Sequence, residues 1–276
     1  MKIPLIKNKA NAVREDTRKD TIGEKRSFAA TEAYKRLRTN VLFSFSDDKK
    51  CRVIGVTSAM AHEGKSTTSI NLAYDMKKVG KKVLLIDADM RLSRVAKVLE
   101  INRSPGLSNF LTVDNNGDHL LQHSEMLDNL TVITCGDLPP NPTELLSSKR
   151  MGALVDTLKK AFDYIIIDLP PVTEVADPLI VSKLIDGMIV VVRQDYADRN
   201  LLSDAVQQLR YNEVKILGFV MTCAQHESKY YKYKYKKYYK KNYHHGYRYG
   251  YGYANSYNAE QNSEPMDELS IKADEE

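Results

Sequence analysis

Short apolar runs alternate with longer amphipathic stretches between about Cys51 and Ala224. Each run is rich in Val, Ile and Leu and has the length of a buried strand. Because the runs are apolar throughout, we expect strands that are covered on both faces. These runs lie at residues 53–57, 82–87, 164–168, 187–193 and 214–222, with a weaker one at 130–134.

The stretches between the runs carry helix signals. A helix is predicted over 65–79, where Gly80 ends it. From Asn141 the sequence provides an N-cap, a proline at the first helical position and a glutamate at the third, and predicts a helix to about Phe162. Two further helices are predicted, one from Asp177 and one over 198–210.

A helix is also predicted before the first strand, from Glu32 onward. Ala33, Leu37, Val41 and Phe45 recur every four positions and would lie on one helical face.

Strands that alternate with helices predict right-handed crossovers in a parallel sheet. We therefore expect an α/β fold of the P-loop NTPase-like type: a doubly wound, mostly parallel sheet with helices on both faces.

Charge occurs in blocks, which indicates solvated segments beside a globular domain. The chain has 276 residues and a formal net charge of +5. Residues 229–250 hold 8 basic residues and no acidic one, whereas residues 258–276 hold 7 acidic residues against one lysine. We expect a flexible N-terminal segment at 1–27, one α/β domain at 28–226, and a disordered tail at 227–276 that is Tyr/Lys-rich and then acidic.

The tail contains 12 of the 17 tyrosines of the chain. Lysines alternate with the rings and each phenol needs a hydrogen-bond partner, so a packed core cannot use them. The sequence therefore predicts tyrosines that are displayed to solvent or to a partner. They are Tyr230, Tyr231, Tyr233, Tyr235, Tyr238, Tyr239, Tyr243, Tyr247, Tyr249, Tyr251, Tyr253 and Tyr257.

Cysteine content and hydropathy bear on where the protein works. The three cysteines are odd in number and share no metal-type spacing, which favours a reduced, cytoplasmic setting. The apolar runs are far shorter than the roughly 20 residues that span a bilayer. Any role at a membrane is therefore expected to come through a partner.

A phosphate-binding loop follows the first predicted strand. Gly64-Lys65-Ser66 opens a predicted helix and matches the end of the P-loop pattern, although Ala59 stands where the pattern has its first glycine. Backbone N–H groups at a helix start point at phosphates, Lys65 neutralises their charge, and the Ser66 hydroxyl is a ligand for Mg²⁺. The expected nucleotide-binding residues are Ala61, His62, Glu63, Gly64, Lys65, Ser66 and Thr67.

Carboxylates follow two further predicted strands. Asp87 ends one strand with Asp89 two residues later, and Asp168 ends another. In open α/β sheets ligands bind beyond the carboxyl ends of the strands, so all three acids can face the loop that holds Lys65. Phosphoryl transfer needs carboxylates there to hold Mg²⁺ and to orient or deprotonate the attacking oxygen.

Five segments resemble the signatures of the bacterial tyrosine kinases of capsule and exopolysaccharide synthesis (BY-kinases), in their separate cytoplasmic form. They also follow one another along the chain in the order of those signatures. SAMAHEGKST resembles the Walker A motif, LLIDADMR the motif called Walker A′, and IIIDLPPV the Walker B motif. EAYKRLRTN and LPPNPTELLSS resemble two further signatures. The segments are 32–40, 58–67, 84–91, 138–148 and 165–172.

The resemblance implies an ATP-dependent protein-tyrosine kinase with Mg²⁺ as cofactor. It implies that Lys65 binds phosphate and that Ser66 and Asp168 hold Mg²⁺, Asp168 through water. Asp87 and Asp89 would serve the metal and the incoming tyrosine hydroxyl, with Asp87 as the favoured base. The implied catalytic residues are thus Lys65, Asp87 and Asp89, and the implied metal residues are Ser66, Asp87 and Asp168.

The resemblance also implies regulation of polysaccharide synthesis and export through partners. Each subunit would phosphorylate the tail tyrosines of a neighbour in a ring-shaped homo-oligomer, such as an octamer. Glu32, Lys35 and Arg38 would lie at the interface, and Lys35 stands where relatives have arginine. A transmembrane adaptor of the polysaccharide co-polymerase type would recruit the kinase to the inner face of the plasma membrane. A tyrosine phosphatase would reset the tail.

Three other functions remain open from the sequence. The first is a partition or septum-positioning ATPase of the P-loop superfamily, although Met60 stands where those proteins carry an additional lysine. The second is nucleic-acid binding by the lysine- and tyrosine-rich tail; the modest net charge and the acidic end argue against a specific nucleic-acid partner. The third is an inactive scaffold that another kinase modifies.

Overall fold

The computed structural model describes residues 21–45, 49–112 and 119–224. The twelve clustered tyrosines all lie outside these ranges, and so does most of the segment predicted at 1–27. The predictions for the two ends and the proposed domain boundaries therefore stay predictions.

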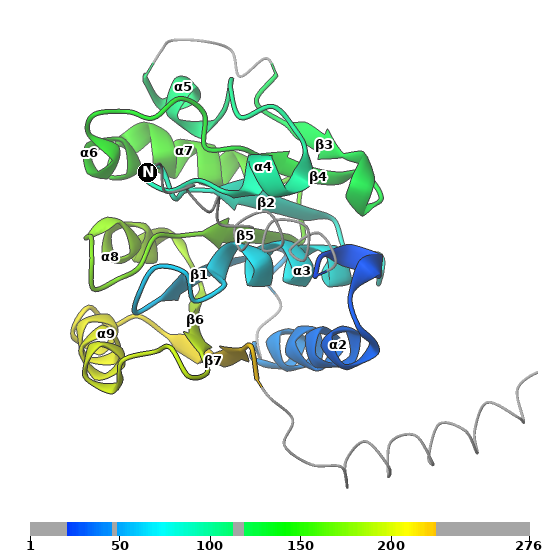
Figure 1. Ribbon diagram of the computed structural model, residues 1–276. Helices are drawn as coiled ribbons and strands as arrows, with labels where there is room; N and C mark the ends of the chain where they lie inside the picture. The colour runs from blue at the N-terminus through cyan, green and yellow to red at the C-terminus, as the bar shows by residue number, and fades with distance from the viewer. Residues whose placement is uncertain (1–20, 46–48, 113–118, 225–276) are drawn as a thin grey trace, which may run out of the picture. The chain divides into compact units, whose positions relative to one another are not determined.

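A seven-stranded sheet forms the centre of the described part of the chain. Its strand order is β3-β4-β2-β5-β1-β6-β7, and Figure 1 shows the strands one below another in this order. All neighbouring strands run parallel except β3, which pairs with β4 in the antiparallel direction. The predicted α/β class and the mostly parallel sheet are confirmed. The strands are β1 (Arg52–Ser58), β2 (Val83–Asp87), β3 (Gln122–Ser124), β4 (Leu130–Ile133), β5 (Tyr164–Asp168), β6 (Gly187–Arg193) and β7 (Ile216–Thr222).

Helices connect most of these strands. The longest are α2, which precedes the first strand, and α3 and α9, which follow β1 and β6. The α-helices are α2 (Phe28–Phe43), α3 (Lys65–Lys77), α4 (Val95–Leu99), α5 (Leu107–Thr112), α6 (Pro142–Leu146), α7 (Lys149–Leu158), α8 (Asp177–Val181) and α9 (Arg199–Tyr211). Three short 3₁₀ helices are η1 (Gly23–Lys25), η2 (Glu125–Leu127) and η3 (Ser182–Leu184). No helix in the described ranges is long and apolar enough to cross a bilayer.

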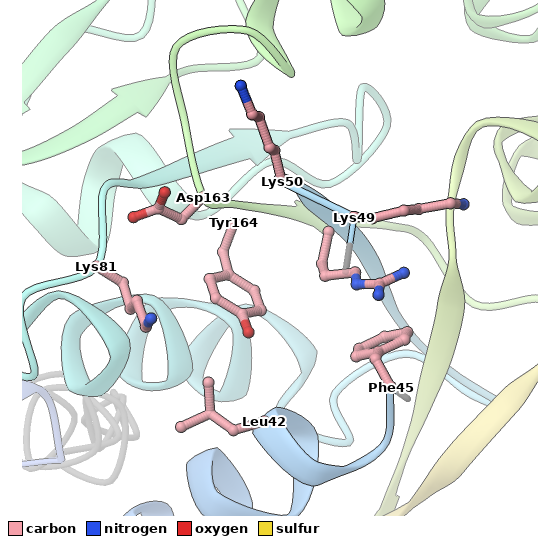
Figure 2. A pocket seen from close by; sticks show the side chains of 8 residues that line it. Leu42, Phe45, Lys49, Lys50, Lys81, Asp163 and Tyr164 are labelled. Carbon is pink, nitrogen blue, oxygen red and sulfur yellow. The ribbon is translucent and has the colours of Figure 1, made fainter. Parts of the chain in front are cut away.

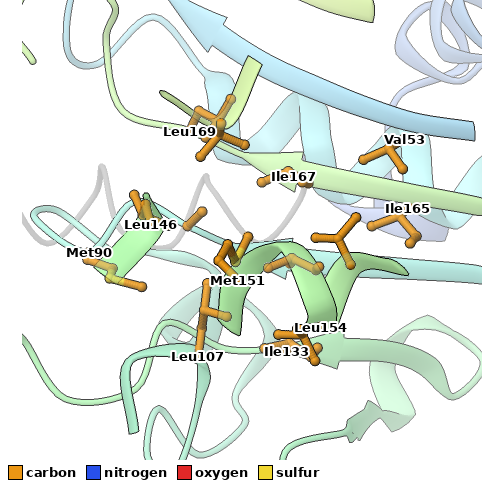
Figure 3. Packing of buried hydrophobic residues seen from close by; sticks show 14 of the residues in the cluster. Val53, Met90, Leu107, Ile133, Leu146, Met151, Leu154, Ile165, Ile167 and Leu169 are labelled. Carbon is orange, nitrogen blue, oxygen red and sulfur yellow. The ribbon is translucent and has the colours of Figure 1, made fainter. Parts of the chain in front are cut away.

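The sheet has an apolar core on each face, because successive side chains of a strand point to opposite sides. On one face Ile165 lies in a core with Met151 and Leu154 of α7 (Figure 3). On the other face the next residue, Ile166, lies in a core with Ile70 of α3. All of these side chains except that of Leu154 are fully buried. The continuous apolar runs read from the sequence are therefore strands covered on both sides.

The single helix predicted from Asn141 to about Phe162 is wrong. The structure has two helices there, α6 and α7, with a break at Ser147 and Ser148. The Ser148 hydroxyl accepts a hydrogen bond from the Met151 N–H at 3.2 Å and so provides the N-cap of α7. Serine competes for backbone groups in this way, which favours a helix start over a helix interior.

Helix α2 differs from its predicted position and face. It begins at Phe28, after Ser27, whose hydroxyl accepts from the Ala30 N–H at 3.3 Å. Ala33 is exposed and Phe45 lies beyond the end of the helix, whereas Val41 is buried as expected. A spacing of four residues exceeds the helical repeat of 3.6, so the stripe drifts around the helix and its first member turns to solvent.

A buried ion pair ties the segment before α2 to α3. The Arg26 guanidinium donates two hydrogen bonds to the Asp75 carboxylate, at 2.5 and 3.2 Å, and both residues are under one-tenth exposed. The guanidinium also lies over the rings of Tyr34 and Tyr74. Because α3 begins at Lys65, this contact holds the helix that carries the lysine predicted to bind phosphate.

We expect Asp75→Ala to lower the free energy of unfolding by about 3 kcal/mol, because it leaves Arg26 buried without its counter-ion. The double variant Arg26→Met/Asp75→Leu should recover most of the loss, since apolar groups replace both charges. Urea unfolding of the three proteins measures this. A single variant as stable as the wild type would show that the pair contributes nothing.

Candidate active site

The loop between β1 and α3 contains two residues with a left-handed backbone conformation. His62 and Gly64 have φ values of 65° and 96°. A Cβ at Gly64 would also lie 3.2 Å from the Thr222 Cγ2 atom, so both conformation and space favour glycine there. Ala59 is described and does not have a positive φ, so alanine can stand where the P-loop pattern has glycine.

Two carboxylates accept hydrogen bonds from the backbone of this loop. The Glu63 side chain is fully buried and accepts hydrogen bonds from the N–H groups of Met60, at 2.8 Å, and Arg193, at 3.3 Å. Glu174, in the loop after β5, accepts from the Ala61 N–H at 3.0 Å. The loop is therefore held in one shape by contacts to its own backbone.

Helix α3 begins at the end of the loop and presents its first turn to the carboxyl edge of the sheet. Lys65 is its first residue and is only 8% exposed. One turn later the Ser69 hydroxyl lies 3.0 Å from both the Lys65 carbonyl oxygen and the Asp168 Oδ1 atom. The helix start that bears Lys65 and Ser66 is thereby tied to the end of β5.

The carboxylates of Asp87, Asp89 and Asp168 gather beside this helix start. Asp87 and Asp168 end the neighbouring strands β2 and β5 and are directly paired in the register. Both are fully buried, and Asp89 is 4% exposed. The structure thus brings together Lys65 and the three acids that the sequence singled out.

Asp87 and Asp89 are oriented by hydrogen bonds from the residues that follow β2. Asp87 Oδ2 accepts from the Ser93 hydroxyl at 2.7 Å and Oδ1 accepts from the Asp89 N–H at 3.2 Å. Asp89 Oδ1 accepts from the N–H groups of Arg91 and Leu92, at 3.3 and 2.9 Å. These hydrogen bonds to the two carboxylates hold the chain after β2 in a turn.

Asp168 keeps one oxygen without a partner. Its Oδ1 atom accepts from Ser69, but Oδ2 is buried and accepts no hydrogen bond from the residues that the structure describes. A buried carboxylate oxygen without a donor is costly unless a cation or its bound water completes the site. The described residues contain no cluster of three His, Cys, Asp or Glu arranged around a metal. Mg²⁺ usually takes one or two carboxylates and fills its remaining positions with water and phosphate oxygens.

Burial dominates the electrostatics of the acidic group. Burial raises the pKa of Asp87 well above its usual range, and the negative charge of Asp168 raises this pKa further. Burial also raises the pKa of Asp168, to about 6, although the Lys65 ammonium and the Ser66 hydroxyl oppose the rise. Without a bound cation the site therefore disfavours full ionisation of its carboxylates.

Sequence reasoning missed several residues of this site. Ser69, Ser93 and Glu174 form hydrogen bonds with residues that the sequence predicted for the site, which are Asp168, Asp87 and Ala61. A serine six residues after Asp87 matches no motif, so the sequence alone does not point to Ser93. A further network links Arg91 and Thr143 to the buried carboxylate of Asp177, at 3.0 and 2.7 Å. Residues of the segments 84–91 and 138–148 therefore meet at Asp177.

The residues predicted for an oligomer interface lie on α2. Lys35 pairs with Glu32 at 2.8 Å, and Arg38 donates to the Asp75 carbonyl oxygen at 3.3 Å. The substituted lysine is thus bound within its own helix, and Arg38 reaches α3. The predicted acceptor tyrosines lie outside the described residues.

Comparison with known proteins agrees with this geometry. Residues 51–214 match the AAA domain family. The tyrosine-protein kinase YwqD of Bacillus subtilis is 38% identical over 69% of this chain and 80% of its own length. The tyrosine-protein kinase CpsD of Streptococcus pneumoniae is 39% identical over 70% and 83% of the two chains. The solved kinase domain of the Escherichia coli tyrosine kinase ETK superposes with a TM-score of 0.66 at 30% identity, over 73% of this chain and 80% of that one. The chain therefore belongs to the bacterial tyrosine kinases of capsule and polysaccharide synthesis, the BY-kinases, in their separate-kinase form.

Proposed function

We propose that this tyrosine kinase transfers the γ-phosphoryl group of ATP to tyrosines in the tail of a neighbouring copy, and that this regulates the synthesis and export of a capsular or extracellular polysaccharide. The observation that carries the proposal is the Asp168 Oδ2 atom, which is buried and accepts no hydrogen bond from the described residues. The Lys65 ammonium lies near this carboxylate. Two directly paired strand ends place Asp87 next to it.

The donor set at this edge fits a magnesium nucleotide. The Ser66 hydroxyl, Asp168 and Asp87 would hold Mg²⁺, which supplies charge neutralisation between the phosphates when bound. The Lys65 ammonium neutralises the transferred phosphoryl group. The loop at residues 61–67 cradles the phosphates through its N–H groups other than that of Ala61, which donates to Glu174. These residues support ATP with Mg²⁺ as the cofactor.

Asp87 is the base in this proposal, with Asp89 beside it. A base must lie within hydrogen-bond reach of the proton that it takes, and the end of β2 holds the buried Asp87 carboxylate beside Asp168. The Ser93 hydroxyl, 2.7 Å away, orients the carboxylate. Asp87 takes the phenolic proton as the tyrosine oxygen attacks phosphorus and the bond to the β-phosphate oxygen breaks.

The tail is the proposed acceptor because its tyrosines are concentrated among cations. The unmodified segment at 229–250 carries 8 basic residues and is attracted to the acidic site. Each phosphate adds about −1.5 to −2 charges at neutral pH, so a modified tail is repelled.

Phosphosite mapping tests the proposal. The purified full chain, first treated with a tyrosine phosphatase, is incubated with ATP and Mg²⁺ and analysed by mass spectrometry. We expect phosphate on tyrosines of 230–257 and none when Mg²⁺ is chelated. Phosphate confined to tyrosines outside the tail would overturn the assignment of the tail as substrate.

Glu174 provides a specific prediction about nucleotide affinity. Glu174→Leu removes the acceptor of the Ala61 N–H, so the loop loses a brace. KM for ATP is expected to rise about three- to tenfold, which corresponds to the loss of one ordinary hydrogen bond. Glu174→Gln keeps an oxygen acceptor at the same place and serves as the matched control. Steady-state kinetics on both variants measures the difference, and equal KM values would refute the bracing role.

The remaining proposals concern partners. A ring-shaped homo-oligomer, such as an octamer, would present each tail to a neighbour, with Glu32, Lys35 and Arg38 on the interface helix. Family membership supports a transmembrane adaptor that brings the kinase to the inner face of the membrane, and a phosphatase that resets the tail. Truncation of the cytoplasmic part of the adaptor should lower autophosphorylation.

Phosphorylation is expected to loosen the oligomer, because the acidic site and a phosphorylated tail repel each other. Sedimentation of a phosphatase-treated sample and an ATP-incubated sample measures this. We expect a smaller mass after incubation with ATP. Equal masses would contradict the proposed release.

A further inference from the structure

The buried carboxylate of Asp177 has no role in the proposed transfer. Asp177 is the first residue of α8 and is fully buried. Its Oδ2 atom accepts a hydrogen bond from the Arg91 Nε at 3.0 Å, and its Oδ1 atom accepts from the Arg91 Nη2 at 3.4 Å. The Thr143 hydroxyl donates to the same Oδ1 atom at 2.7 Å. Because a buried carboxylate that loses its partners is costly, we expect these three side chains to keep one arrangement.

The cluster joins three segments that are far apart in the sequence. Arg91 lies in the turn after β2, Thr143 lies in α6 and Asp177 lies in α8. The Arg91 Nη2 also donates to the Thr143 hydroxyl at 3.1 Å, so each of the three side chains contacts the other two. Helices α6 and α8 lie next to each other (Figure 1). The guanidinium is therefore held by groups from two helices outside its own turn.

Arg91 connects this cluster to the two acids at the end of β2. Its backbone N–H and that of Leu92 donate to the Asp89 Oδ1 atom, at 3.3 and 2.9 Å. The next residue, Ser93, donates through its hydroxyl to the Asp87 Oδ2 atom at 2.7 Å. Three consecutive residues thus orient both acids, and the side chain of the first is anchored in the cluster. The positions of the two carboxylates therefore depend on this anchor.

We propose that Asp177 is a positioning residue for phosphate transfer, which acts through the Arg91 guanidinium on the turn that orients Asp87 and Asp89. The inference rests on the proposed function, because it requires Asp87 to take the proton of the incoming tyrosine. A contact of two guanidinium nitrogens with two carboxylate oxygens fixes direction as well as distance. Such precision matters, since a misplacement of about 1 Å can cost roughly 10²-fold in rate.

The alternative is that Arg91 itself neutralises charge on the transferred phosphoryl group. Its side chain is 39% exposed and carries the necessary positive charge. The geometry favours positioning, because the Nε and Nη2 atoms are already bound to Asp177 and Thr143. The two roles differ in what they require of Asp177. A direct role of Arg91 does not need that carboxylate, whereas positioning does.

The test compares Arg91→Met, Asp177→Val and the double variant Arg91→Met/Asp177→Val with the wild type. We expect each variant to lower kcat for tail phosphorylation by about 10- to 100-fold, the effect of a displaced base. KM for ATP should stay within about twofold, because the contacts of the loop before Lys65 are unchanged. The double variant should lose no more than either single variant, since all three break the same contact. Rates measured at several ATP concentrations, on phosphatase-treated full chains, give both constants.

Urea unfolding of the same proteins separates positioning from stability. Arg91→Met leaves the Asp177 carboxylate buried without its counter-ion, so this variant should be less stable than the wild type. The double variant removes both charges and should recover most of that stability. Its kcat should nevertheless stay low. A kcat that recovers together with stability would show that the cluster has only a structural role.

The matched control is Lys49→Met/Asp186→Val, which removes an ion pair of 2.7 Å at the opposite edge of the sheet. Figure 2 shows Lys49 beside the start of β1. Asp186 also accepts a hydrogen bond from the Val53 N–H at 2.8 Å, so this change also removes an anchor of the backbone. We expect lower stability but a kcat within about twofold of the wild type. A loss of kcat as large as that of Asp177→Val would overturn the proposal.

Three further results would overturn it. A wild-type kcat in Asp177→Val would do so, and a slow Arg91→Met beside it would assign the direct role to Arg91. A loss in the double variant equal to the product of the single losses would show that the two residues act independently. A higher KM for ATP with an unchanged kcat would place the effect on nucleotide binding. An inactive wild type would refute the proposed function and the inference together, whereas an active wild type with equally active variants would refute the inference alone.

Discussion

Lys65→Met is expected to lower kcat/KM for tyrosine phosphorylation by about 10²- to 10³-fold, the effect of removing one preorganised charge from a transferring group. The ammonium lies in the first turn of α3 beside Asp168, and its side chain is almost wholly enclosed. Methionine keeps the length and the apolar stem but cannot neutralise phosphate. The rate of phosphate transfer to the tail, measured at several ATP concentrations, gives the loss.

The matched control for this change is Lys77→Met on the same helix. Lys77 lies at the far end of α3, where its ammonium donates to the Asn129 carbonyl oxygen at 3.3 Å. We expect this variant to phosphorylate the tail within about twofold of the wild type, the effect of a change outside the site. A Lys65→Met protein that keeps a tenth or more of the wild-type rate would contradict the role given to Lys65.

Asp87→Asn is expected to remove activity and to stabilise the ligand-free protein at the same time. Loss of a positioned base costs about 10²- to 10⁴-fold in rate. Burial raises the pKa of Asp87, so its ionised form destabilises the folded state at neutral pH, and asparagine removes that charge. The Ser93 hydroxyl, which donates to the aspartate, can instead accept from the asparagine amide. We expect the variant to have a higher free energy of unfolding than the wild type at pH 7.5.

The pH dependence of this gain follows from the direction of the shift. Below the unfolded pKa of about 3.9 the carboxyl group is protonated in both states and costs nothing. As pH rises toward the higher folded pKa, the unfolded state releases its proton first and wild-type stability falls relative to the variant. Asp168→Asn should behave alike, with its gain opening between about pH 4 and the folded pKa of about 6.

Urea unfolding from pH 4 to pH 8 in EDTA measures both variants. Asp204→Asn, at an exposed position of α9, is the control and should show no such trend. Addition of Mg-ADP should stabilise the wild type more than Asp87→Asn, because the ligand compensates the buried charges. A variant that is less stable than the wild type at pH 7.5 would show that Asp87 is a structural residue.

Local sequence patterns were enough to predict the strands that build this site. The apolar runs that end at Asp87 and Asp168 become β2 and β5, because a continuous apolar run with a polar end suits a buried parallel strand. The glycine and lysine of the loop were also readable, since helix starts have characteristic chemistry. The proximity of the two carboxylates follows from strands that are adjacent and in register.

Other parts of the molecule depend on contacts between distant segments. Ser93 and Ser69 gain their roles only where the fold brings them to Asp87 and Asp168. The short antiparallel strand β3 has three residues, one of them buried, and offers no period to detect. The break between α6 and α7 was hidden because Ser148 is a cap only if the preceding helix ends there.

The most direct measurement of the central claim is phosphate transfer between two distinguishable copies. A full-length Lys65→Met chain, which keeps its tail tyrosines, is mixed with an active chain whose twelve clustered tyrosines are all replaced by phenylalanine, and ATP with Mg²⁺ is added. We expect phosphotyrosine on the tail of the Lys65→Met chain in the mixture and none when that chain is incubated alone. An unlabelled tail in the mixture, or equal labelling of the Lys65→Met chain alone, would contradict the central claim.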